Sequence, residues 1–133
     1  MLCACIECMN KDWKIREGVL FNVLRASRHA HPNEFIALLS LLEKDSKLIG
    51  EIVVTPSESG RDYAGLHSHL IPLDPLIVGT VHSHPSHSPF PSEQDLVTFS
   101  KMGEIHLIVC RPYSPDTLRA FNAKGRPIPI EVV

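Results

Sequence analysis

The sequence contains no apolar run long enough to cross a membrane. Its longest runs, such as Phe35 to Leu42, are much shorter than the roughly 20 apolar residues that a spanning helix requires. The first residues also lack the basic segment and the apolar segment that open a secretory signal. We therefore expect no membrane association and a cytoplasmic location.

An excess of charge of one sign is also absent. The formal net charge is -2, from 13 Lys and Arg and 15 Asp and Glu. The basic residues are scattered, whereas a protein that binds the phosphate backbone of a nucleic acid usually presents them as a stripe. The sequence therefore predicts no nucleic-acid partner.

What the sequence does contain is the composition of an ordinary globular domain. Of its 133 residues, 44% are hydrophobic and 21% are charged, and a chain of this length can bury a core without disulfides or a structural metal. A metal site in it is therefore best explained as catalytic. We expect one domain over residues 11–133, acting as a monomer or a homodimer, preceded by a cysteine-containing extension over residues 1–10 that could be disordered.

Cysteines are few, and three of the four are crowded near the start. Cys3, Cys5 and Cys8 form the pattern C-x-C-x-x-C, which could bind a soft metal or sense redox state, with Cys110 as a distant fourth sulfur. Three thiols near a chain terminus are more often incidental. Cys110 follows an apolar run and is expected to be buried as a small hydrophobic residue.

The first half of the chain predicts one helix followed by strands. Apolar residues recur at helical spacing over residues 15–29, with charged residues between them, and Pro32 ends the pattern. Two continuous apolar runs, Phe35–Leu42 and Leu48–Val54, are joined by a short polar segment. They predict two neighbouring strands in a hairpin.

The middle of the chain predicts a loop and two further strands. Residues 56–65 are rich in Ser and Gly and indicate a surface loop that could line a substrate groove. A short strand is expected at Leu66–Ile71. The run Leu76–Val81 predicts a buried strand that leads into His82, and the proline-rich residues 85–91 that follow predict an irregular, stiff connection.

The last third predicts a second helix and three more strands. Leu96, Phe99 and Met102 are spaced to form the inner face of a helix that Gly103 ends. This order of elements favours an α+β fold, in which a curved mixed sheet, or partial barrel, is flanked by two main helices. The final strands are expected at Ile105–Cys110, Thr117–Phe121 and Ile128–Val132.

The chain contains three H-x-H pairs, and one of them is followed by the rest of a metal site. Alternate residues of a strand point to the same face, so an H-x-H pair at a strand end can direct two imidazoles at one ion. His82 and His84 are followed, eight and eleven residues past His84, by Ser92 and Asp95. Neither Ser nor Asp stands at these distances after the other two pairs, His29/His31 and His67/His69.

Asp95 has two compatible interpretations. Ser92 and Asp95 have the spacing of a capping box at a helix start. An Asp in the first turn of that helix also faces back toward the strand end that carries His82 and His84. Because zinc needs a third ligand besides two imidazoles, Asp95 is the candidate.

The remaining histidines have simpler explanations. His29 and His31 are expected to flank the end of the first helix, where a cationic side chain suits the helix dipole. The rival pair, His67 and His69, could lie on an exposed strand edge instead of binding a metal. The last two, His87 and His106, are expected in a loop and in a strand.

The segment from His82 to Asp95 resembles the JAMM motif, H-x-H-x7-S-x2-D, of the MPN+ metalloproteases. That family also has an upstream acid, which matches Glu34. The likeness extends in order and spacing from about Ile15 to Val132, and the short stand-alone prokaryotic members are the most similar in size. The resemblance implies the MPN/JAB architecture, which is similar to that of cytidine deaminases.

The resemblance also implies the roles of the site residues. His82, His84 and Asp95 would hold one zinc ion with a bound water as fourth ligand. Glu34 would form a hydrogen bond to that water and carry its proton, and Ser92 would help to stabilise the oxyanion. From the residues alone, Glu34 could instead begin a strand or pair with a neighbouring Arg.

Members of this family cut the peptide or isopeptide bond after the C-terminal Gly-Gly of ubiquitin or a ubiquitin-like protein. Residues 56–65 and 96–104 leave little room for the insertions with which larger members hold ubiquitin. The implied partner is therefore a conjugate of a small ubiquitin-like modifier or of a sulfur-carrier protein. A related activity is release of an amino acid such as cysteine from a sulfur-carrier tail.

Three alternatives remain open at this point. The chain could be a non-catalytic MPN scaffold or partner-binding module, although all the ligand residues are present. It could be a thiol-based metal or redox sensor that acts through the N-terminal cysteines. Iron is the chemical alternative to zinc for a site of two histidines and one carboxylate.

Overall fold

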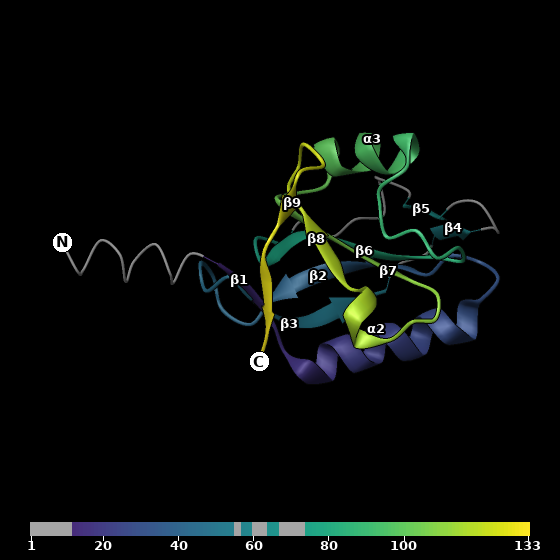
Figure 1. Ribbon diagram of the computed structural model, residues 1–133. Coiled ribbons are helices and arrows are strands. Elements are labelled where there is room, and N and C mark those ends of the chain that lie inside the picture. Colours follow the sequence, from purple (N-terminus) through teal and green to yellow (C-terminus); the bar gives the residue numbers. More distant parts are fainter. Residues whose placement is uncertain (1–11, 55–56, 60–63, 67–73) are drawn as a thin grey trace.

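The computed structural model describes residues 12–54, 57–59, 64–66 and 74–133, which form one large sheet, two α-helices and a small separate hairpin (Figure 1). Cys3, Cys5 and Cys8 lie outside the described residues, as do His67 and His69. The elements in chain order are β1 (Trp13–Ile15), α2 (Glu17–Ala30), β2 (Ile36–Leu41), β3 (Leu48–Val53), β4 (Ser57–Ser59), β5 (Ala64–Leu66), β6 (Ile77–His84), α3 (Glu93–Lys101), β7 (Ile105–Cys110), a 3-10 turn (Pro115–Thr117), β8 (Arg119–Phe121), β9 (Pro127–Ile128) and β10 (Ile130–Val132).

The large sheet is mixed and nearly closed. Its strand order is β10-β1-β3-β2-β6-β7-β8-β9. β2 runs antiparallel to both β3 and β6, whereas β6 and β7 are parallel and are connected through α3. Only Pro129 separates β9 from β10, which pair with opposite ends of the order, so the end of the chain bridges the two sides of the sheet. The predicted α+β fold with a curved mixed sheet and two main helices is confirmed.

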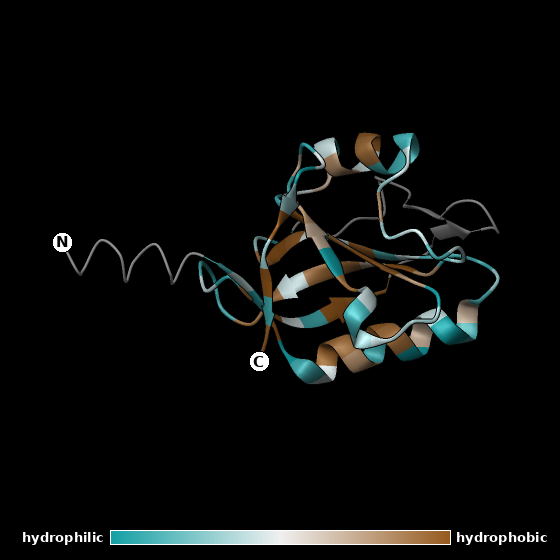
Figure 2. Ribbon diagram, in the orientation of Figure 1, coloured by the Kyte–Doolittle hydropathy of each residue, from teal (hydrophilic) through white to brown (hydrophobic). Residues whose placement is uncertain are grey.

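The helix α2 covers one face of the sheet, and α3 lies on the other side (Figure 1). Most apolar side chains of α2, among them Val19, Leu20 and Val23, are buried against the sheet, whereas Phe21 and the charged residues are exposed. This amphipathic pattern is visible as alternating hydropathy along α2, above which the central strands are largely hydrophobic (Figure 2). The predicted helix is therefore confirmed, although Ile15 ends β1 instead of beginning the helix.

The second helix is less well buried than the sequence predicted. Phe99 is fully buried, but Leu96 is 40% exposed and Met102 is only partly buried. Phe99 forms a small core cluster of its own with Ile108 and Phe121. The expected inner face of three residues is wrong for Leu96, and α3 is anchored mainly through Phe99.

The strand predictions differ from the structure in several places. The single strand expected at Ile128–Val132 is two strands, β9 and β10, and the strand expected at Thr117–Phe121 begins at Arg119, because Thr117 ends a 3-10 turn. The segment 56–65 was expected to be a loop, but Ser57–Ser59 and Ala64–Leu66 pair as an antiparallel hairpin. The strand expected at Leu66–Ile71 lies largely outside the described residues, since only Leu66 is described there, as the last residue of β5. The pairing of β2 with β3 is confirmed, and β1, at Trp13–Ile15, was not predicted. No helix in the described part of the chain is long and apolar enough to span a membrane.

Candidate metal centre

The strand β6 carries His82 and His84 at its C-terminal end, in the middle of the sheet between β2 and β7. Both side chains project from the same face because residues two apart on a strand point in the same direction. His82 is 3% exposed and His84 is 8% exposed. Their Nε2 atoms lie 3.2 Å apart, so the two imidazoles meet at one point as the H-x-H pattern predicted.

Asp95 reaches this point from the first turn of α3. Its Oδ1 lies 3.0 Å from His82 Nε2, and its Oδ2 lies 3.0 Å from His84 Nε2. The same carboxylate accepts the Ser92 backbone N–H at 2.8 Å, and Ser92 Oγ accepts the Asp95 N–H at 3.1 Å. The predicted capping box is confirmed, and it fixes Asp95 with its oxygens toward the histidines.

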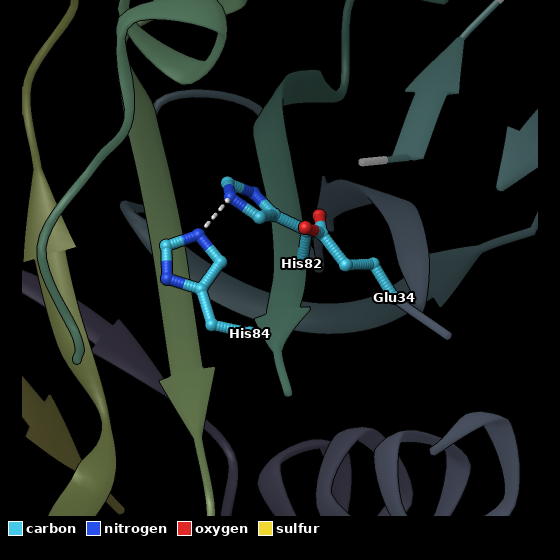
Figure 3. A group of neighbouring side chains, drawn as sticks. All are labelled: Glu34, His82 and His84. Atoms are coloured by element: carbon cyan, nitrogen blue, oxygen red, sulfur yellow. Dashed lines mark hydrogen bonds between the residues drawn. The ribbon is translucent and has the colours of Figure 1, made fainter. Parts of the chain in front are cut away.

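Glu34 approaches from the segment between α2 and β2. Its side chain is buried, and one carboxylate oxygen and the two imidazole nitrogens all lie within 4.8 Å of one another. Figure 3 shows the Glu34 carboxylate beside His82, with the imidazoles of His82 and His84 facing each other. Glu34, the acid that the family resemblance implied, thus lies next to the histidine pair.

The backbone orients one of the imidazoles. His84 Nδ1 lies 2.9 Å from the Ser88 carbonyl. Because a carbonyl can only accept, Nδ1 carries the proton and donates it. Such an outer hydrogen bond sets the tautomer and ring orientation that leave Nε2 for a metal.

The Asp95 carboxylate and the His84 imidazole have perturbed pKa values. Burial alone would raise the pKa of Asp95, but hydrogen bonds from His82 and His84 outweigh it and hold this pKa well below its ordinary value. Burial alone would lower the pKa of His84, but the Asp95 hydrogen bond, the Ser88 carbonyl and the charges of Asp95 and Glu34 raise it. Asp95 is therefore an anion at neutral pH, and a cation that binds here would displace a proton from the cluster.

The geometry of these donors fits a tetrahedral zinc ion. Two nitrogen or oxygen ligands that lie about 2.0 Å from zinc at a tetrahedral angle are about 3.3 Å apart. The contacts among His82, His84 and Asp95 are 3.0 to 3.2 Å. Two imidazoles and one carboxylate are also ligands that zinc accepts, with a fourth position left open. Glu34 offers a second carboxylate, with one oxygen within 4.8 Å of the two imidazole nitrogens.

The other described histidines do not join the centre. His29 is exposed in the last turn of α2, and His31 caps that helix, as expected. The Nδ1 atom of His31 lies 2.7 Å from the Tyr113 hydroxyl. His87 is exposed in the loop after β6, and Cys110 is buried, both as predicted.

His106 is a buried strand residue with its own partners. Its Nε2–H donates to the Gly103 carbonyl at 3.1 Å, and its Nδ1 lies 2.8 Å from Thr80 Oγ1. Burial lowers its pKa to about 4. Its ring stacks on Phe99, which also lies against the rings of His82 and Phe121. His106 therefore supports the helix that carries Asp95.

Two residues around the centre were not predicted from the sequence. The Ser88 carbonyl fixes His84, but any residue type supplies a carbonyl, so its identity gives no signal. Ser83 stands inside the H-x-H pattern and binds Phe35, the neighbour of Glu34. A serine between two candidate ligands is the one signal that could have identified it.

Comparison with known proteins places these observations in a family. The model of a family described as prokaryotic homologs of the JAB domain matches residues 17–124. A protein of Haloferax volcanii named a probable metalloprotease is 33% identical over 118 residues, which cover 83% of this chain and 73% of that protein.

Two solved structures have the same fold with substantial sequence identity. One is a JAB1/MPN domain protein from Archaeoglobus fulgidus, which is 39% identical, with a TM-score of 0.72, over 90% of this chain and 98% of that one. The other is described as JAMM, a metalloprotease-like zinc site in the proteasome and signalosome. It is 38% identical, with a TM-score of 0.72, over 92% of this chain and 98% of that one.

Proposed function

The chain belongs to the family of prokaryotic JAB-domain homologues and is a zinc metalloprotease of the JAMM type, and from this premise we propose which residues form its site and which bond it cuts. His82, His84 and Asp95 hold one zinc ion. Glu34 is the general base and acid, and Ser92 stabilises the oxyanion. The reaction is hydrolysis of the bond after the C-terminal Gly-Gly of a ubiquitin-like modifier or a sulfur-carrier protein.

The observation that carries the ligand assignment is the mutual distance of the three donors. Their contacts of 3.0 to 3.2 Å match the spacing of ligands around zinc. The Ser88 carbonyl holds the outer nitrogen of His84, and the Ser92 N–H holds Asp95 Oδ2, the oxygen that faces His84. A ligand trio held in this way needs little rearrangement to receive the ion.

When bound, zinc would lower the pKa of a coordinated water and polarise the scissile carbonyl. Glu34 lies close enough to the histidines to accept a proton from a water between them. Its burial keeps bulk water from competing for that proton. The carboxyl group can then return the proton to the leaving amine, which makes the cleavage of an amide bond feasible at neutral pH.

In this proposal Ser92 acts on the substrate carbonyl. It is exposed, and its Oγ accepts the Asp95 N–H, which directs the hydroxyl proton outward. A hydroxyl that donates to the developing oxyanion contributes on the order of 3 kcal/mol to lowering the barrier. The capping box therefore serves the helix, the candidate ligand Asp95 and the candidate oxyanion donor together.

The substrate assignment is supported by the chemistry of the site and by the family. A buried acid beside an open metal position cleaves amide bonds, and a Gly-Gly tail is slim enough to bring its carbonyl to a centre at the end of a strand. Amino-acid release from a sulfur-carrier tail uses the same chemistry. A panel of tail adducts, with a protein, a peptide or a single cysteine as the leaving group, separates these substrates.

The proposal is tested with Glu34→Gln, which keeps the size of the side chain but removes the base. Hydrolysis of a linear fusion ending in Gly-Gly is expected to fall about 10²- to 10⁴-fold, while the zinc content stays at the wild-type value. Glu43→Gln, at an exposed position in the β2–β3 turn, is the matched control and should cleave normally. Wild-type rates in Glu34→Gln would exclude Glu34 as the base.

A further inference from the structure

Ser83 connects the strand of the histidines to the segment that carries Glu34. In the pairing of β2 with β6, Ile36 stands opposite His82, so Phe35 continues the pairing opposite Ser83. The Ser83 backbone N–H donates to the Phe35 carbonyl at 2.9 Å. The Phe35 N–H donates in turn to Ser83 Oγ at 2.8 Å. In a regular antiparallel pair the Phe35 N–H would donate to the Ser83 carbonyl. Here it donates to the Ser83 side-chain hydroxyl instead.

The Ser83 side of this contact is fully buried, and the Phe35 side is half-buried. Ser83 is 0% exposed, and its neighbours His82 and His84 are 3% and 8% exposed. The Phe35 N–H is itself partly buried, so removal of the hydroxyl leaves this donor without its acceptor where water has only limited access. The position of the backbone at Phe35 therefore depends on the Ser83 hydroxyl.

Glu34 is one residue before this contact. It lies outside β2, which begins at Ile36, so regular strand pairing does not hold it. Its carboxylate must nevertheless stay within a few ångströms of the histidines to carry a proton, and a displacement of about 1 Å in a reacting group can cost about 100-fold in rate. The hydrogen bond from the Phe35 N–H to Ser83 Oγ, beside the backbone bond between the same two residues, holds the chain next to Glu34.

We propose that Ser83 is a positioning residue, which holds the Glu34 carboxylate at the metal centre through its hydrogen bond to the Phe35 N–H. The inference rests on the proposed role of Glu34 as the base. Ser83, which lies between the two histidines, thus positions Glu34, which belongs to the segment before β2.

The first test is amide hydrogen exchange of Phe35 in metal-free protein, which requires no activity. Ser83→Ala should make this amide exchange about 5- to 10-fold faster, as expected for the loss of one buried hydrogen bond. Ser27→Ala is the matched control, because Ser27 is also 0% exposed and hydrogen-bonded, but to Val23 within α2. Unchanged exchange at Phe35 in Ser83→Ala would overturn the proposal, whether or not the wild type cleaves a Gly-Gly fusion.

The second test is a double-mutant cycle in the zinc-loaded enzyme. Ser83→Ala should lower kcat about 10- to 100-fold with KM and zinc content unchanged, and Ser83→Thr, which keeps the hydroxyl, should restore much of the loss. In the Glu34→Gln background Ser83→Ala should cost less than about 3-fold, because the group it positions is gone. The proposal would be contradicted if the losses of kcat in Ser83→Ala and Glu34→Gln multiplied in the double variant. It would also be contradicted if the loss of kcat in Ser83→Ala matched a loss of zinc. A wild type that does not cleave would instead refute the proposed function, and the Phe35 exchange would still decide the role of Ser83.

Discussion

The same H-x-H pattern occurs at the end of a strand and at the end of a helix, with different results. His82 and His84 end β6, are buried, and bring their Nε2 atoms within 3.2 Å of each other. His29 and His31 end α2 and are exposed, and His31 contacts the Tyr113 hydroxyl. Residues two apart share one face of a strand but lie on nearly opposite sides of a helix. The element, together with a third residue from elsewhere, determines whether the pair can hold an ion.

The largest expected difference between the two pairs is in zinc content. His84→Ala should lose most bound zinc and reduce hydrolysis of a Gly-Gly fusion by more than about 10³-fold, because the trio loses one ligand. His29→Ala should keep one zinc and change the rate less than about 2-fold. Elemental analysis of both purified variants is the measurement. Equal zinc loss in both would mean that the exposed pair also binds metal.

His106 is a buried histidine outside the candidate metal site, so its titration shows the effect of burial alone. Burial lowers its pKa to about 4 from an ordinary value of 6.5, so the folded state favours the neutral ring. The resulting stability is fully present above pH 6.5 and is lost as the pH falls through 6.5 toward 4. Between pH 7 and pH 4 this loss should reach about 3 kcal/mol.

The His106 prediction is checked by urea unfolding at several pH values, with His106→Gln as the comparison. Gln has no titrating group, so the difference between the two proteins should shrink as the pH falls. A difference that stays constant from pH 7 to pH 4 would show that His106 does not titrate on unfolding.

The smallest expected effect concerns the partner of the exposed pair. Tyr113→Phe removes the hydroxyl that contacts His31 and should lower the free energy of unfolding by about 1 kcal/mol, as for a typical hydrogen bond. Zinc content should not change. Denaturant unfolding and metal analysis test the two parts of the prediction, and a loss of zinc would connect the α2 end to the metal centre.

Much of the fold could be predicted from apolar runs and periodicity. The strands β2, β3 and β6 and the helix α2 have continuous or periodic apolar sequences, and they were found within a few residues. β1 could not be found because its three residues, with Lys14 between Trp13 and Ile15, are too few to show a pattern. It is a strand because β3 and β10 pair with it on either side.

The candidate site also has one part that the sequence predicts and one part that it does not. His82, His84 and Asp95 stand close in sequence, and their spacing already predicted that they would meet. The position of Glu34 beside them depends on the register of β2 on β6, which the sequence does not reveal. The hydrogen bond between the Phe35 N–H and Ser83 Oγ depends on that same register, so only the structure shows it.

The most direct test of the metal centre is the zinc content of the wild type beside Asp95→Asn. Asn keeps an oxygen that can accept the Ser92 N–H, so the helix cap is retained while the anionic ligand is lost. The structure leads us to expect about one zinc per wild-type chain, a large loss of zinc in Asp95→Asn, and a loss of Gly-Gly cleavage with it. An unchanged zinc content in Asp95→Asn would contradict the assignment of His82, His84 and Asp95 as the metal ligands.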